Sequence, residues 1–215
     1  MSVSLPNGSI LSLATAYGVA KPVTAISNAN PGVASAAAHG FANGALLEVT
    51  SGWSKIDGRI IRVAGQVAGA FNLDGIDTID TKLFPAGAGA GSVREITGFA
   101  QISQVLELST SGGEQQFATY SFLENDYDSQ IPTTLSAQSV SISIADDPTL
   151  PGYQALKAAS DAKAVRALKM VLPSGSVLLY NGYVSFNETP TMTKGNVMAC
   201  KATFSLLSRP VRYAS

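Results

Sequence analysis

Residues 152–213 read GYQALKAASDAKAVRALKMVLPSGSVLLYNGYVSFNETPTMTKGNVMACKATFSLLSRPVRY, and the fold expected for the chain rests mainly on them. Its first part repeats apolar residues at helical spacing: Tyr153, Leu156, Ala159 and Ala162. Pro151 precedes them, in a position suited to a first helical turn. Two apolar strands joined by Pro-Ser-Gly follow, which predicts a hairpin. A last long strand over residues 197–213 completes a mainly β (α+β) fold: a β-sandwich or barrel with one flanking helix.

Strand patterns also precede this stretch. Residues 140–144 alternate strictly, with Val140, Ile142 and Ile144 facing inward and serines between them, which predicts a half-buried strand. Residues 94–110 alternate well enough for one long strand, which SGGEQQ then breaks. Residues 9–18 form a first strand.

Residues 21–83 show a different sequence pattern. Short β-prone runs alternate with turn signals such as NANPG and Asp57-Gly58, which is typical of a small all-β module, and Trp53 is expected to anchor its core. A Gly/Ala-rich segment follows and is predicted to be a linker. We therefore divide the chain into four parts: a first strand in residues 1–20, an inserted module in 21–83, a linker in 84–94 and a main domain in 95–215.

The composition suggests a chain that assembles. Only 13% of its 215 residues are charged, about half of the usual fraction of roughly 25%. Either much of the surface faces other subunits, or this is an ordinary domain of weak charge. The N-terminal residues do not form a secretory signal, and no apolar run is long enough for a membrane span, so we expect a soluble product made in a cytoplasm.

No pattern indicates catalysis, a cofactor or a metal. His39, the single histidine, lies in a turn-like segment without a partner motif. AGAGAGS lacks the Lys-Ser/Thr ending of a phosphate loop, and the alternate carboxylates near residue 126 lack the Gly and Glu of a calcium loop. Cys200, the single cysteine, lies in a strand-like run and is expected to be buried and inert. We predict a protein that is not an enzyme.

Charge is distributed unevenly along the chain. Residues 96–147 carry seven acidic and no basic side chains, whereas residues 148–215 carry eight basic and two acidic ones. Three interpretations remain open: an acidic hairpin meets the basic face of a neighbouring copy, an acidic face repels polyanions, or the two blocks pair within one chain.

The stretch FLENDYDSQIP, residues 121–131, concentrates this acidity. Glu124, Asp126 and Asp128 occupy alternate positions, so an extended backbone would place them on one face, about 7 Å apart. Three like charges on one face disfavour burial, and they must face water, a cation or a basic partner.

The succession of elements in residues 152–213, together with the acidic, aromatic hairpin of about residues 110–134, resembles the major tail tube protein family of long, non-contractile-tailed bacteriophages. That resemblance implies a structural virion protein of the tail. It implies hexameric rings that stack into a hollow tube, with neighbouring sheets joined edge to edge. The expected partners are other copies of the chain, the tape measure protein and the tail-end proteins. DNA would pass through the lumen without specific binding, and no membrane insertion is expected.

The resemblance also implies roles for charged residues. The candidates for ring stacking or lumen lining are Glu107, Glu114, Glu124, Asp126, Asp128, Asp146 and Asp147. The candidates for a basic partner face are Lys201, Arg209 and Arg212. For residues 121–131 we favour stacking over lumen lining.

Residues 21–83 depart from the simplest members of that family. We interpret them as an insertion that decorates the outside of the tube, so its deletion should leave a foldable tube domain. Two alternatives to a tube protein remain: a tail terminator or secretion-tube-like ring, and a carbohydrate- or surface-binding β-domain.

Overall fold

The computed structural model describes residues 7–214; residues 1–6 of the predicted first segment lie outside the described residues. The elements are β1 (Ile10–Tyr17), β2 (Lys21–Val23), β3 (Ala25–Ile26), β4 (Val33–Ser35), β5 (Leu46–Ser51), β6 (Ile60–Val67), β7 (Ala70–Leu73), β8 (Gly91–Ile102), β9 (Val105–Ser111), β10 (Gln115–Tyr120), β11 (Ser129–Leu135), β12 (Ser139–Ala145), α1 (Pro151–Asp161), β13 (Val165–Val171), β14 (Val177–Thr191), β15 (Ala199–Leu206) and β16 (Val211–Tyr213). The prediction of a mainly β fold with one helix is confirmed.

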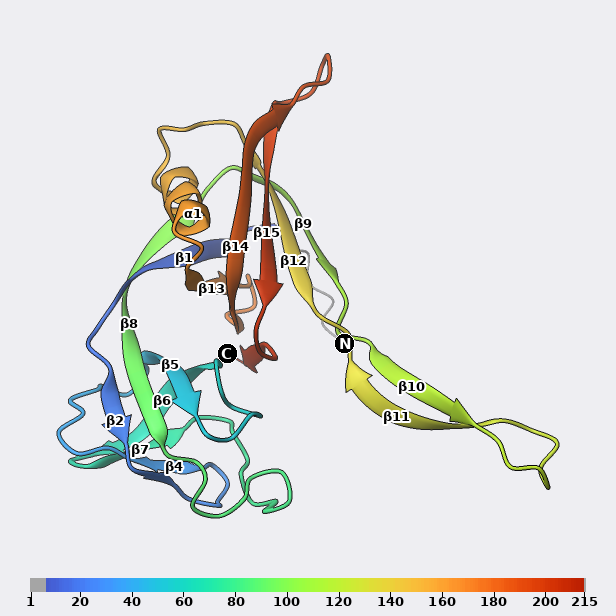
Figure 1. The fold of residues 1–215 in the computed structure, drawn as a ribbon. Coiled ribbons are helices and arrows are strands. Elements are labelled where there is room, and N and C mark those ends of the chain that lie inside the picture. The colour runs from blue at the N-terminus through green and yellow to red at the C-terminus, as the bar shows by residue number, and fades with distance from the viewer. Residues whose placement is uncertain (1–6, 215) are drawn as a thin grey trace.

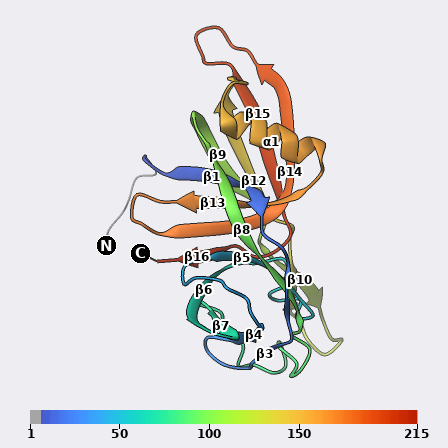
Figure 2. The same ribbon diagram turned by 90° about the vertical axis from the view of Figure 1, so that its left-hand side faces the viewer.

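One curled antiparallel sheet organises the chain (Figure 1). Its strands follow the order β3-β4-β7-β6-β5-β8-β1-β13-β14-β15-β12-β9, with β16 paired to β14 and β2 to β8. Strands β2 to β7 form a small lower part, and the remaining strands form the main body with α1 at its side (Figures 1 and 2). The hairpin β10–β11 projects away from both parts (Figure 1).

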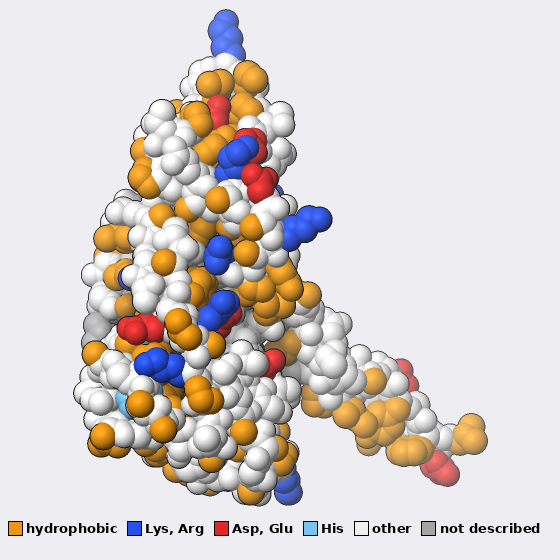
Figure 3. All heavy atoms as spheres, turned by 60° about the vertical axis from the view of Figure 1, so that its left-hand side comes forward, with side chains coloured by type: hydrophobic (Ala, Val, Ile, Leu, Met, Phe, Trp, Pro, Cys, Tyr) orange, Lys and Arg blue, Asp and Glu red, His pale blue; other side chains and the backbone are white. Residues whose placement is uncertain are grey.

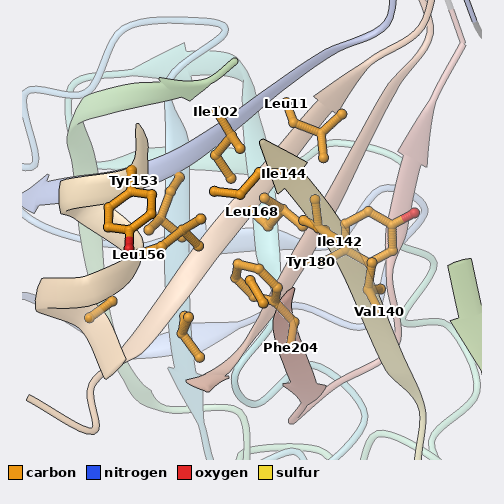
Figure 4. Close-up of a cluster of buried hydrophobic side chains, with 14 of the residues drawn as sticks. Leu11, Ile102, Val140, Ile142, Ile144, Tyr153, Leu156, Leu168, Tyr180 and Phe204 are labelled. Atoms are coloured by element: carbon orange, nitrogen blue, oxygen red, sulfur yellow. The ribbon is translucent and has the colours of Figure 1, made fainter. Parts of the chain in front are cut away.

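Alternation builds the core of the main body. Val140, Ile142 and Ile144 on β12 are buried, as their spacing predicts, and Phe204 on β15 packs among them (Figure 4). The helix begins at Pro151 and buries Tyr153, Leu156 and Ala159 against this cluster, so the predicted helix and its apolar face are confirmed. Ala162, the fourth member of the predicted face, follows the last helical turn as its C-cap.

A glycine lets the helix approach the sheet closely. A Cβ atom on Gly152 would lie 2.5 Å from the carbonyl oxygen of Gln101 on β8, so only glycine fits there without a shift. The start of α1 is therefore held directly against the backbone of β8.

The lower part has its own core around Trp53, as predicted. Trp53 is buried, its indole N–H donates to the Pro85 carbonyl at 2.8 Å, and its ring packs edge-on against Phe84. The Gly/Ala segment is thus packed against the tryptophan, and its last residues, 91–94, already belong to β8. The segment therefore packs against the lower part, whereas a flexible linker was predicted. Small side chains permit flexibility, but they also permit close approach to a large ring.

A shared seam joins the two parts. One buried cluster contains Ile60 from the lower part and Ile96, Leu179 and Tyr213 from the main body, and the partly buried Leu46 of the lower part packs against it. Strand β8 crosses the seam, since its first half pairs with β2 and β5 and its second half with β1. The division into an insert and a tube domain stays a prediction, but the two parts are packed through a common core.

Polar contacts reinforce the seam. The carboxylate of Glu48 on β5 accepts a hydrogen bond from the Asn181 side chain on β14 at 3.0 Å and forms an ion pair with Arg94 on β8. The Tyr213 hydroxyl accepts from the backbone amide of Arg62 at 2.8 Å and donates to the Asp74 carbonyl. Burial raises the pKa of Tyr213, so the hydroxyl stays neutral and can keep both bonds.

Two predicted long strands are each divided in the structure. The strand expected over residues 94–110 breaks between β8 and β9, where Gln104 has a positive φ of 54° and the chain changes direction. The strand expected over residues 197–213 ends at Leu206, and the chain then turns so that β16 pairs with β14. The breaks fall at Ser103-Gln104 and at Ser208-Arg209-Pro210, and these polar segments are too short to stand out between the apolar residues on either side.

Candidate functional site

The most exposed part of the chain is the hairpin of residues 115–135, here called the arm. All of its residues except Ser129 are exposed, yet it carries a group of large apolar side chains: Phe117, Tyr120, Phe122, Leu123, Tyr127, Ile131 and Leu135. Figure 3 shows hydrophobic side chains gathered along one edge of the arm and at its end. Each such side chain contributes about 1.5–3 kcal/mol when it is fully buried, so the arm is suited to a surface that another molecule covers.

Glycines set the place where the arm leaves the sheet. Gly112 and Gly113 have φ of 76° and 82°, which non-glycine residues rarely adopt. SGGEQQ therefore ends β9 as predicted and turns the chain into β10. At this base the Glu114 amide donates to the Ser136 hydroxyl at 3.0 Å.

The three alternate carboxylates lie at the tip of the arm. Residues 121–128 form turns between β10 and β11, so the extended geometry that would place Glu124, Asp126 and Asp128 on one face is wrong. The chain must reverse within these eight residues, and the Asn125 amide donates to the Phe122 carbonyl at 3.0 Å to close that turn. The tip nevertheless combines three carboxylates with Phe122, Leu123 and Tyr127, all exposed.

The four strands β9, β12, β15 and β14 expose a second distinctive surface, here called the hydroxyl face. Cross-strand pairing arranges its side chains in three rows of four: Ser111, Ser139, Ser205 and Tyr183; Ser109, Ser141, Thr203 and Ser185; Glu107, Ser143, Lys201 and Asn187. The opposite face of the same strands carries the buried core. Eight of these twelve side chains are Ser or Thr, and the other four are Tyr183, Asn187, one acid and one base.

The two charges on this face share a row. Ser143 pairs with Glu107 on one side and with Lys201 on the other, so the two charged residues are two strands, about 10 Å, apart. Both line one shallow hollow together with Ser109, Ser141 and Ser143. At this distance the carboxylate weakens the positive potential of the lysine without binding it directly.

Asp146 and Asp147 lie at the other end of β12, away from the arm. The Cys200 thiol donates to Asp146 at 3.4 Å, and the Thr149 hydroxyl and amide donate to Asp147 at 2.6 and 3.0 Å. The hydroxyl donation, followed by that of the amide, lowers the pKa of Asp147. Burial raises the pKa of Cys200, which is buried as predicted. These two carboxylates therefore cap local structure beside α1.

The proposed basic residues lie on different elements. Lys201 belongs to the hydroxyl face, Arg212 extends from β16, and Arg209 lines a hollow at the base of the arm with Leu135 and Gly113. Among the seven acidic candidates, the structure groups Glu124, Asp126 and Asp128 at the arm tip, with Glu114 at its base and Glu107 on the hydroxyl face.

A second projection was not predicted from the sequence. The loop between β14 and β15 rises beyond the body at the end opposite the arm (Figures 1 and 2). We call residues 188–198 the β14–β15 tip; it exposes Met192, Val197 and Met198, with Lys194 as the one charge between Glu188 and Lys201. The available signal was the presence of Met192, Val197 and Met198 in the otherwise polar segment NETPTMTKGNVM.

β9 ends the sheet of the main body, and β14 has a free edge along part of its length. β9 is last in the strand order, and within residues 7–214 its ladder partner is β12. β13 stops opposite Tyr183, so residues 184–191 of β14 extend past it. There the Phe186 amide donates to the Ser160 hydroxyl at 3.0 Å and Pro190 has no amide hydrogen, features that are typical of an edge strand.

A groove of about 620 Å³ runs beside the β9 edge. Its apolar lining comes from Leu11, Leu106, Leu108, Met170 and Leu172, among others. The edge therefore offers both a backbone ladder and apolar contacts to a second chain.

His39 has a structural role. Its ring lies 2.8 Å from the Val67 carbonyl, accepts a hydrogen bond from the Phe41 amide and packs between Phe41 and Phe71. Within residues 7–214, no three metal-binding side chains cluster.

The projecting arm, the hydroxyl face and the open strand edges together suggest that the chain is a subunit of a larger assembly. Comparison with known protein families identifies the kind of assembly. The sequence pattern of the phage tail tube protein (TTP) family matches residues 51–215. The chain belongs to the phage tail tube protein family. Tail tube proteins are structural components of the virion tail. The resemblance noted from the sequence is therefore confirmed.

The matched range begins at Ser51, inside the predicted insert, so β6 and β7 of this tail tube protein fall within it. Comparison with curated protein sequences gives no match. Of the described residues, none belongs to a helix long and apolar enough to cross a membrane.

Proposed function

We propose that this tail tube protein forms hexameric rings that stack into the tail tube, and that phage DNA passes through the lumen during ejection. The open edges of the main-body sheet carry this proposal. The neighbouring strands of the sheet follow the spatial order β14-β15-β12-β9, and each is antiparallel to the next. The first and last of them, β14 and β9, therefore run in opposite directions. Placing the β9 edge of one copy beside the β14 edge of the next therefore continues an antiparallel sheet, and rotational symmetry closes it into a barrel.

The hydroxyl face would then line the lumen. The apolar face of the same strands is covered by the chain's own core and α1, so the hydroxyl face is the one left for the channel. Small hydroxyl groups bind phosphates weakly compared with Lys or Arg, and the lone Lys201 has Glu107 nearby. Such a wall lets DNA slide without being held. The tape measure protein would occupy this lumen before ejection, and tail-end proteins would cap the tube.

Electron microscopy of the purified protein tests the proposal. Tubes with a central channel are the expected result. Discrete rings would favour the terminator-like alternative, and a monomer at all concentrations would contradict assembly through the sheet edges.

Replacing Glu107 with Gln tests the lumen assignment. Because Lys201 loses its neighbouring carboxylate, we expect assembled tubes to retain short duplex DNA more strongly. The slope of the logarithm of the DNA-binding constant against the logarithm of the salt concentration should become steeper by about one unit. The measurement is DNA retention at several salt concentrations. Asp80→Asn in the lower part removes the same charge elsewhere and should leave retention unchanged; equal effects of the two variants would contradict a lumenal Glu107.

Reversing the charges of the arm tip tests stacking. We expect Glu124→Lys, Asp126→Lys and Asp128→Lys together to impair tube formation while monomer folding is retained, because all three side chains are exposed. Sedimentation and circular dichroism give the two readouts. Normal polymerisation of this variant at several salt concentrations would show that the tip carboxylates do not contribute to stacking.

A further inference from the structure

We propose that the tip of the arm docks on the β14–β15 tip of a copy in the adjacent ring, as an aromatic-to-methionine contact. This inference rests on the proposed stacked tube and specifies its joint. It names the surface that receives the arm, which the sequence analysis had sought among Lys201, Arg209 and Arg212.

The arm and the β14–β15 tip lie in positions that allow contact between stacked rings. The arm extends from the ends of β9 and β12 at Ser111 and Ser139, whereas the β14–β15 tip extends from the far ends of β14 and β15. All four strands belong to one antiparallel ladder, so the projections lie at opposite ends of it (Figure 1). If the strands run along the tube, head-to-tail stacking brings the arm of one ring to the β14–β15 tip of the next.

The chemistry of the two tips is complementary. The arm tip presents aromatic rings, with Tyr120 and Phe122 in edge contact at 5.5 Å between centroids. The β14–β15 tip presents two methionines, and Met192 is 73% exposed. Thioethers are flexible and make favourable contacts with aromatic ring edges, so methionine is well suited to a surface that adapts to an aromatic partner. Neither group is covered by the rest of the described chain.

Charge supports the same pairing. The charged side chains of residues 115–135 are all acidic: Glu124, Asp126 and Asp128. The β14–β15 tip carries Glu188 and Lys194, and Glu188 already forms an ion pair with Lys157, so Lys194 is the charge that the tip can offer to the arm. Because both elements are narrow and exposed, this opposition directs their approach more than it adds affinity.

Polar substitution of the methionines tests the need for this surface. We expect Met192→Ser with Met198→Ser to raise the lowest protein concentration that forms tubes by about tenfold, while ring size is unchanged. Val67→Ser with Ile79→Ser is the matched control, since these residues of the lower part are 59% and 58% exposed. The control should assemble as the unmodified chain does.

Cross-linking tests the contact itself. With Leu123→Cys and Val197→Cys in one chain, a short bis-maleimide should join copies into a covalent ladder in tubes, and each single cysteine variant should not. Normal assembly of the methionine variant, or a double cysteine variant that cross-links no better than the single ones, would overturn this inference alone. If the unmodified chain forms no tubes, the proposed function fails as well.

Discussion

Deletion of residues 21–83, with the ends rejoined by a short linker, is expected to give insoluble or unfolded protein. This is the opposite of what the sequence pattern suggests, and the shared seam is the reason. The deletion removes Leu46 and Ile60 from a cluster that also buries Ile96, Leu179 and Tyr213. Exposing three such side chains costs about 5–9 kcal/mol, comparable to the whole stability of a typical domain, about 5–15 kcal/mol.

Soluble expression and circular dichroism of the deleted chain provide the measurement. In the full chain the same seam predicts a single cooperative unfolding transition by calorimetry, because neither part can lose its structure without exposing the other. A soluble, folded deletion product, or two separate transitions in the full chain, would support an independent insert instead.

Deletion of the arm is expected to have the contrasting effect. Replacing residues 112–138 with Asn-Gly would close a two-residue hairpin between Ser111 and Ser139, which are paired across β9 and β12. Because the arm is almost entirely exposed, we expect the free energy of unfolding to change by about 1 kcal/mol or less, a shift of about 2–4 °C in Tm. Tube formation should be lost.

Thermal unfolding and electron microscopy together give the outcome for the arm. The deletion of residues 21–83 is the matched comparison, since both variants lack an internal segment but only one should unfold. A folded, arm-deleted chain that still forms long tubes would show that the edges of the sheet alone are sufficient for stacking.

The local elements of this protein could be predicted from the order of its residues. Alternation at Val140, Ile142 and Ile144 predicted β12, the spacing of Tyr153, Leu156 and Ala159 predicted α1, and Pro-Ser-Gly predicted the β13–β14 hairpin; the structure confirms all three. These signals are reliable because burial on one face imposes a period that survives in the order of residues. The succession of these elements was also sufficient to identify the family.

The breaks in the strands, the grouping of surface side chains and the core that the two parts share come from tertiary packing. The tip carboxylates lie in turns because the chain must reverse there, and strand pairing on both sides of Ser143 brings Glu107 to about 10 Å from Lys201. The seam likewise joins Ile60 to Tyr213, far apart in the chain. Register and long-range packing depend on contacts between distant residues, and such contacts leave no periodic trace in a single sequence.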